Sequence, residues 1–335
     1  MFHLRQRLFL ILLCLSIASF KMHGQETPRR IANIGIGHHT NPTDGSRVGN
    51  LVVGLFGYVD SIRGLQINLL NSGAGKEMRG VQLSGIASVT GITKGLQAAM
   101  ISTITTRPLY GVQLAGVTTV SPGIACGMQL SGVANIADGV VRGVQISGYN
   151  YAGILNGVQV GLINVADSHP RGVQVGLFNF SRDTIGCKFG LVSINPSTRI
   201  DLMTFAGSST KINLALRFKN RSTYSIIGFG THYIGFDARF SGALYYRLGQ
   251  YFDLSPRWSV SSDVGYYHIE TFEAEQVTRP RRLYALQLHV NVDYRINKIL
   301  GLYISTGYGM TRFYRGNESY RNRALVEGGL LIHYK

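Results

Sequence analysis

The chain has 335 residues, of which 42 are Gly and only 15% are charged, and its formal net charge is +16. An apolar content of 45% is too high for a disordered chain, and 8 Pro are too few for collagen. Ordinary soluble domains carry roughly 25% charged residues. The lower fraction here favours a β-rich protein that does not face water on every side.

Residues 1–24 have the pattern of a secretory signal peptide. Two Arg side chains precede an apolar run from Leu8 to Ile17. This run is shorter than the ~20 residues that a membrane-spanning helix needs. Gly24 supplies a small residue before a cleavage point, so we expect an exported chain in which residues 25–63 form N-terminal strands.

Residues 64–198 contain nine copies of a short phrase, Gly–apolar–Gln–apolar, at intervals of 14 to 16 residues. Helical repeats need about 33 residues or more, so this period predicts β structure. The ninth copy opens at Gly186 and has Lys188 in place of Gln. The residues that define the repeat are Gly64, Gly80, Gln82, Gly95, Gly111, Gln113, Gly127, Gln129, Gly143, Gln145, Gly157, Gln159, Gly172 and Gln174.

Two architectures fit this period. In a β-solenoid each copy is one coil, glycines serve the corners, and the glutamines stack as an outward amide ladder. The side chains expected to point inward are Val81, Leu83, Ile86, Val89, Met128, Leu130, Val133 and Ile136. Alternatively, the copies are antiparallel strands that enlarge one membrane barrel. The near-constant copy length favours the solenoid, with the strands before Gly64 as its cap.

A basic residue precedes the opening Gly in five copies: Arg63, Arg79, Lys94, Arg142 and Arg171. In a solenoid these side chains fall along one edge. The first interpretation is a solvated edge that discourages edge-to-edge pairing. The second is a polyanion-binding stripe for acidic glycans or lipopolysaccharide phosphates.

Residues 199–335 alternate between apolar and polar side chains, which predicts an antiparallel barrel. Over 285–295 every second residue is apolar and the intervening ones are polar. We expect eight strands, near 199–206, 210–219, 223–234, 239–252, 257–271, 282–296, 300–314 and 323–335. Their length suits tilted membrane strands. Aromatic residues expected in interfacial girdles are Tyr245, Tyr246, Tyr251, Trp258, Tyr266, Tyr267, Tyr303, Tyr308 and Tyr314.

Eight strands close a small barrel whose interior is filled by side chains. The expected polar core consists of Arg217, Arg247, Asp263, His289, Asp293, Glu327 and His333. The fold class is therefore all-β, a Gly-rich solenoid followed by an outer-membrane-type antiparallel barrel. One larger barrel that includes the repeats is the alternative.

The chain resembles the surface-repeat outer-membrane proteins of Bacteroides-like bacteria, whose repeats also occur in Leptospira-like surface proteins. The similar phrases are GVQLSG, GVQISG, GVQVGLIN and GVQVGLFN in the repeats, and TKINLALRFKN, GTHYIG, GYYHIETF, RLYALQL and VEGGLL in the C-terminal third. This resemblance implies an exported envelope protein with no assigned reaction.

The sequence contains no strong catalytic signal. His268 and Glu270 share a strand face near Ser262, but no nucleophile-elbow phrase accompanies them. We expect no enzyme activity, no cofactor, no metal and no nucleic-acid partner. Two functions stay open: a non-enzymatic structural or interaction protein of the outer membrane or cell surface, and a porin-like channel formed by one large barrel.

Overall fold

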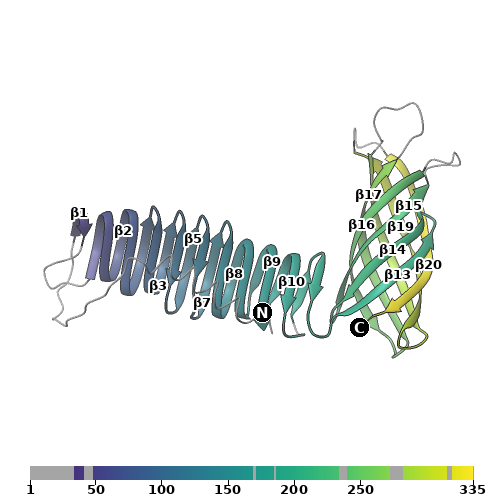
Figure 1. Ribbon diagram of the computed structural model, residues 1–335, viewed down its shortest axis with the longest axis horizontal. Helices are drawn as coiled ribbons and strands as arrows, with labels where there is room; N and C mark the ends of the chain where they lie inside the picture. Colours follow the sequence, from purple (N-terminus) through teal and green to yellow (C-terminus); the bar gives the residue numbers. More distant parts are fainter. Residues whose placement is uncertain are drawn as a thin grey trace. The chain divides into compact units, whose positions relative to one another are not determined.

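The structure is a computed structural model that describes residues 34–40, 48–168, 171–184, 186–233, 240–271, 282–314 and 319–334. The predicted signal peptide lies outside the described residues. The chain divides into two compact units, Met1–Tyr151 and Ala152–Lys335. Its strands follow two pairing patterns, parallel up to Ile194 and antiparallel from Arg199 onward (Figure 1).

The repeat region is a stack of parallel strands. Equivalent positions of successive copies are partners, so Gly95 pairs with Gly111 and Gly111 with Gly127. The strands are β1 (Ile34–Thr40), β2 (Val48–Ser84), β3 (Ala87–Ala99), β4 (Ser102–Thr105), β5 (Leu109–Ala115), β6 (Thr118–Val120), β7 (Ala125–Ser131), β8 (Ala134–Leu155), β9 (Val158–Ser168), β10 (Val173–Ser181), β11 (Cys187–Phe189) and β12 (Val192–Ile194). Parallel stacking is the solenoid alternative. The repeats therefore do not enlarge the barrel.

Backbone geometry explains why glycine occupies the opening position of the repeat. In the first six copies they have positive φ, +139° at Gly111 for example. A Cβ on Gly111 would lie 2.1 Å from the carbonyl oxygen of Gly95 in the preceding coil. Only Gly tolerates both the torsion and this close approach, which explains why the residue returns in these six copies.

The repeated glutamines point inward, so the outward ladder expected from the sequence is wrong. The side chain of Gln129 is buried, and its Nε2 donates to Oε1 of Gln113 at 2.9 Å. Gln145 donates to Gln129 in the same way, also at 2.9 Å. Gln113, Gln129 and Gln145 thus bond to one another along the stack, which offsets the cost of burying their amides.

A second amide row lies beside the first. Asn135 Nδ2 donates to Asn150 Oδ1 at 2.9 Å, and Asn164 Nδ2 donates to Asn179 Oδ1 at the same distance. Together the two rows fill one half of the coil interior with polar groups. Alternation along the strands then turns the apolar residues outward, which corrects their expected inward orientation. Ile86, Met128 and Val133 are among the exposed side chains.

The other half of the coil interior is apolar in most copies; in the copy that opens at Gly95 it is polar, because the buried Thr93 takes the equivalent position and its hydroxyl lies 2.7 Å from that of Thr105. Met78, Leu109 and Leu155 occupy the position two residues before an opening Gly, and all three are fully buried. Small side chains such as Ala137 and Ala166 lie within this half. The coils that contain Met78, Leu109 and Leu155 therefore have an amide-lined side and an apolar side.

The antiparallel strands close a barrel in the order β13 to β20, with β20 pairing back to β13. Its strands are β13 (Arg199–Gly207), β14 (Thr210–Lys219), β15 (Thr223–Tyr233), β16 (Phe240–Asp253), β17 (Trp258–Thr271), β18 (Arg282–Arg295), β19 (Leu300–Phe313) and β20 (Ser319–His333). The eight predicted strands are confirmed to within a few residues. Figure 1 shows them as a cylinder of tilted strands.

Side chains of the barrel strands cap the open edge of the last solenoid coil. Ser225 Oγ donates to the carbonyl of Leu191 at 2.9 Å, and Tyr246 OH donates to that of Gly190 at 2.8 Å. Asn220 Nδ2 donates to the carbonyl of Ser193 at 3.2 Å. Side chains of the barrel thus satisfy carbonyls that an uncapped stack would leave unpaired.

Candidate functional site

The outer surface of the solenoid is divided by charge. We define the uncharged flank as the surface formed by positions 1 to 9 after each opening Gly. Across the first eight copies this stretch contains no charged residue. All charged side chains of these copies fall in the remaining positions, the charged edge: Lys76, Glu77, Arg79, Lys94, Arg107, Asp138, Arg142, Asp167, Arg171, Arg182 and Asp183.

The uncharged flank exposes large apolar side chains. Met100 is 75% exposed, Leu69 66% and Leu162 59%. A shallow groove crosses several coils and is lined by apolar and small side chains, among them Leu83, Met100, Leu114, Leu130 and Ile146. Further exposed members of the flank are Ile67, Ile86, Ile101, Val117, Val133, Val160, Ile163, Val175, Leu177 and Phe178. Contiguous exposed apolar surface is uncommon on soluble monomeric proteins, so this flank is the candidate interaction surface.

The predicted basic residues lie on the charged edge, where those of the central coils form one register row. Arg79 pairs with Lys94, and the row continues through Tyr110 and Cys126 to Arg142. The row is thus interrupted by two uncharged positions. This part of the edge is a mixed row rather than a continuous cationic stripe.

An acidic side chain neutralises part of that row. Glu77 Oε1 lies 2.8 Å from Lys94 Nζ and 3.0 Å from Arg79 Nε. The hydrogen bond from Lys94 is the main cause that holds the pKa of Glu77 below its ordinary value. These exposed pairs contribute little to stability. Within the part of the chain that the structure describes, Arg142 is the basic side chain of this row that has no acidic partner.

The barrel lumen is filled by a buried ionic network. Arg247 donates to Asp263 at 2.7 Å and to Glu327 at 2.9 Å. A second centre joins Arg217 to Asp201 at 2.7 Å and to Asp293 at 2.9 Å. His289 Nδ1 and His333 Nδ1 lie within hydrogen-bond distance of Asp263 and Asp201. The predicted polar core is therefore present, with Asp201 as a member that the sequence reasoning missed.

Aromatic side chains also fill the lumen, which corrects part of the girdle prediction. Tyr245, Tyr251, Tyr267 and Tyr303 are buried, and the Tyr245 and Tyr267 rings stack at 4.7 Å between centroids. Of the nine aromatic residues expected in girdles, the outward ones are Tyr246, Trp258, Tyr266, Tyr308 and Tyr314.

The outer face of the barrel is apolar. Its exposed side chains include Leu214, Leu216, Phe229, Leu244, Val264, Leu286, Leu288, Val290, Leu302, Ile304, Val326 and Leu330. A closed antiparallel barrel with an apolar exterior and a polar interior has the inside-out pattern of a transmembrane barrel. The fold therefore defines a membrane β-barrel protein that carries a repeat solenoid. No helix within the described ranges has the length and hydropathy of a transmembrane helix.

The His–Glu pair considered from the sequence lies on this outer face. His268 Nε2 is 3.0 Å from Glu270 Oε1, while its Nδ1 is 2.9 Å from Tyr314 OH. Arg282 also pairs with Glu270, at 2.8 Å. Both nitrogens of His268 thus have partners other than Ser262, and the geometry does not form a triad.

No protein-family model matches the chain, and no curated protein matches it. Solved structures that match include the N-terminal barrel domain of Pseudomonas aeruginosa OprF, with 7% identity and a TM-score of 0.30. The match covers 41% of this chain and 97% of the OprF domain. Neisserial surface protein A matches with 9% identity and a TM-score of 0.27 (41% and 92% coverage). The attachment invasion locus protein Ail of Yersinia pestis matches with 14% identity and a TM-score of 0.27 (41% and 97%). At these scores the fold assignment rests on strand pairing, not on the neighbours.

Proposed function

We propose that this protein is a non-enzymatic scaffold of a Gram-negative outer membrane, in which the barrel is the anchor and the solenoid is the interaction module. The observation that carries this proposal is the filled barrel. Its exterior suits lipid, while Arg217 and Arg247 occupy the lumen with their carboxylate partners. A filled lumen favours an anchor over the porin-like alternative, which requires the repeats to enlarge the barrel.

The strand connections support one orientation in the membrane. The chain enters the barrel at Arg199 and leaves it at His333, at the same end as the turns 220–222, 254–257 and 296–299. The opposite end has the connections 208–209, 234–239, 272–281 and 314–318. Outer-membrane barrels place short turns in the periplasm and longer loops outside. This orientation puts the attached solenoid in the periplasm rather than at the cell surface.

The proposed occupant of the uncharged flank is the lipid leaflet nearest to the solenoid. An apolar flank without charge, bordered by an edge with more basic than acidic side chains, has a composition typical of surfaces that lie in a membrane interface. Arg142 and Arg171 would then meet anionic phospholipid headgroups. An acidic glycan or lipopolysaccharide would be the partner of these residues if the barrel had the opposite orientation.

Cysteine labelling in cells tests the anchor and its orientation. After Cys126 and Cys187 are changed to Ser, Asp138→Cys reports on the charged edge and Ser208→Cys on the opposite end of the barrel. We expect a membrane-impermeant maleimide to label position 208 in intact cells and position 138 only after the outer membrane is opened. Labelling of position 138 in intact cells would contradict the periplasmic placement. Recovery of the chain in the soluble fraction would contradict the anchor.

Planar-bilayer recording tests the channel alternative. Because the ionic network fills the lumen, we expect no steady conductance from the purified full chain. Stable channel openings that are also present in a solenoid-disrupted variant would contradict the filled-anchor proposal.

A further inference from the structure

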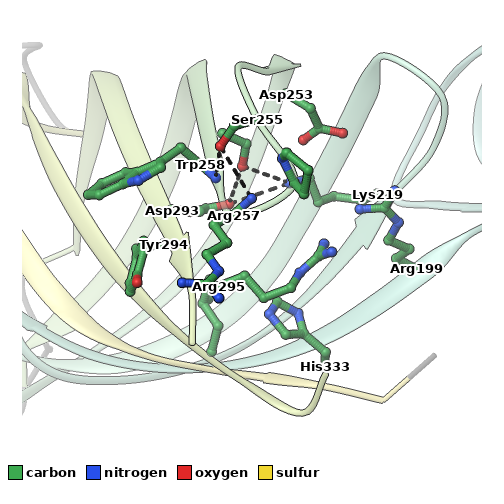
Figure 2. A pocket seen from close by; sticks show the side chains of 13 residues that line it. Arg199, Lys219, Asp253, Ser255, Arg257, Trp258, Asp293, Tyr294, Arg295 and His333 are labelled. Carbon is green, nitrogen blue, oxygen red and sulfur yellow. Dashed lines mark hydrogen bonds and ion pairs between the residues drawn. The ribbon is translucent and has the colours of Figure 1, made fainter. Parts of the chain in front are cut away.

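A cavity of about 190 Å³ opens at the short-turn end of the barrel (Figure 2). Its cationic lining comes from Arg199 on β13, Lys219 on β14, Arg257 in the turn before β17, and Arg295 at the end of β18. His333, at the end of β20, also lines it. Residues from both ends of the barrel sequence are thus brought to one opening.

The cations of this cavity differ from those deeper in the lumen. Arg217 and Arg247 each have carboxylate partners, and Lys219 lies 3.4 Å from both Asp293 and Ser259. The guanidinium groups of Arg199, Arg257 and Arg295, by contrast, have no ion pair or side-chain hydrogen bond among the described residues. Positive charge therefore remains uncompensated at the opening.

The acidic residues of the lining do not remove this excess. Asp293 is already shared between Arg217 and Lys219, and Asp253 is exposed at the rim. His333 uses Nδ1 for Asp201 at 2.6 Å, and its buried Nε2 has no partner in the structure. The free donors around the cavity are therefore the guanidinium groups of Arg199, Arg257 and Arg295, and they surround a space that an anion could occupy.

Aromatic residues place this opening at the level of lipid headgroups. Trp258 and Tyr294 line the same cavity, and their rings lie 4.6 Å apart between centroids. Trp258 is exposed on the outer side of the barrel. Amphipathic rings of this kind concentrate where a membrane meets water. An anion in the cavity would therefore lie at the depth of phosphate groups in the leaflet.

We propose that this cavity binds a phosphate group, carried by an anionic phospholipid headgroup or present as free phosphate. Planar guanidinium groups match phosphate oxygens in pairs, and such charge-assisted hydrogen bonds are among the strongest in proteins. The site extends the anchoring role of the barrel and does not depend on the solenoid. Its failure would leave the proposed scaffold function intact.

Binding to the purified full chain distinguishes the two phosphate sources. Native mass spectrometry measures retention of phosphatidylglycerol against phosphatidylcholine, and calorimetry in detergent measures inorganic phosphate. The test variant is Arg257→Gln with Arg295→Gln. The control is Arg221→Gln, because Arg221 lies in a turn at the same end, is exposed and does not line the cavity. Heat-modifiable migration on gels confirms that each variant contains a folded barrel.

We expect the double variant to lose at least about tenfold in phosphatidylglycerol retention or phosphate affinity, with the control unchanged. Loss confined to the lipid assay identifies a headgroup site, and loss in both assays identifies a site for phosphate itself. Equal retention of the two lipids without phosphate binding would overturn the proposal. Equal losses in the test variant and the control would overturn it as well.

Discussion

Replacement of Gln129 by Leu tests whether the interior of this solenoid is polar. Gln129 accepts from Gln145 and donates to Gln113, both at 2.9 Å, within a fully enclosed row. Leu has nearly the same volume but no amide. The substitution leaves Oε1 of Gln113 without its donor and removes one acceptor from Nε2 of Gln145.

The size of the effect follows from these two lost partners. A buried polar group without its partner costs about 1–3 kcal/mol, so two such losses cost about 2–6 kcal/mol. Burial of the Leu side chain offsets part of this, at about 1.5–3 kcal/mol. We expect a net destabilisation of the coil of about 2 kcal/mol, which is the difference between the midpoints of the two ranges.

Urea-dependent proteolysis of the full chain in detergent measures this change, because the barrel stays folded while the coils open. The matched control is Met128→Gln, one residue away, where the side chain is 37% exposed. We expect the control to shift stability by less than about 1 kcal/mol. If Gln129→Leu is neutral or stabilising while Met128→Gln is strongly destabilising, the polar interior is refuted.

Three further substitutions test other parts of the structure. Burial lowers the pKa of Lys188 to about 8. Between pH 8 and 10.5 the unfolded chain therefore binds more protons than the folded chain. The free energy of unfolding of the last coil should accordingly rise by about 2–3 kcal/mol as pH rises through that window. Lys188→Gln should remove this pH dependence in urea titrations, and an unchanged slope would contradict the assignment. Gly111→Ala should destabilise the solenoid by more than about 3 kcal/mol, because its Cβ would meet the Gly95 carbonyl; wild-type protease resistance would count against this. Arg247→Met should cost about 3–5 kcal/mol by leaving Asp263 and Glu327 unpaired, and it should lower the temperature of the heat-modifiable gel shift; an unchanged temperature would show that the network is dispensable.

The barrel could be predicted from the sequence in considerable detail. Its strands have one apolar and one polar face, and a membrane barrel has only one way to orient them. Leu286 and Leu288 face outward while His289 and Asp293 face the lumen, as the alternation predicts. The exception is the tyrosines. Tyr245 and Tyr303 are amphipathic enough to suit either an interfacial girdle or a polar lumen, and only the register decides between them.

The solenoid orientation could not be predicted from alternation alone. A period of two residues fixes which side chains share a face, but it does not fix which face is inside. Hydrophobicity favours Val81 and Leu83 inside, whereas stacking of identical amides at one-coil spacing favours Gln82. The second choice prevails because most of the glutamines bond to the glutamine of the next coil, as in the 2.8 Å bond from Gln82 to Gln66, and Gln97 donates instead to Ser88 and to the carbonyl of Ile104. These hydrogen bonds form only when the coils stack in parallel register, and that register is set by the tertiary structure.

The most direct test of the solenoid and its proposed membrane contact is a spin-label accessibility scan of one whole copy, residues 127–142, in the full chain reconstituted into lipid. Oxygen reports contact with acyl chains, and a polar nickel complex reports contact with water. We expect oxygen accessibility at positions 128, 130 and 133, little access of either reagent at 129 and 135, and nickel accessibility at 138 and 142. Water access at 129 together with protection at 128 and 130 would contradict the polar interior and the uncharged flank at once.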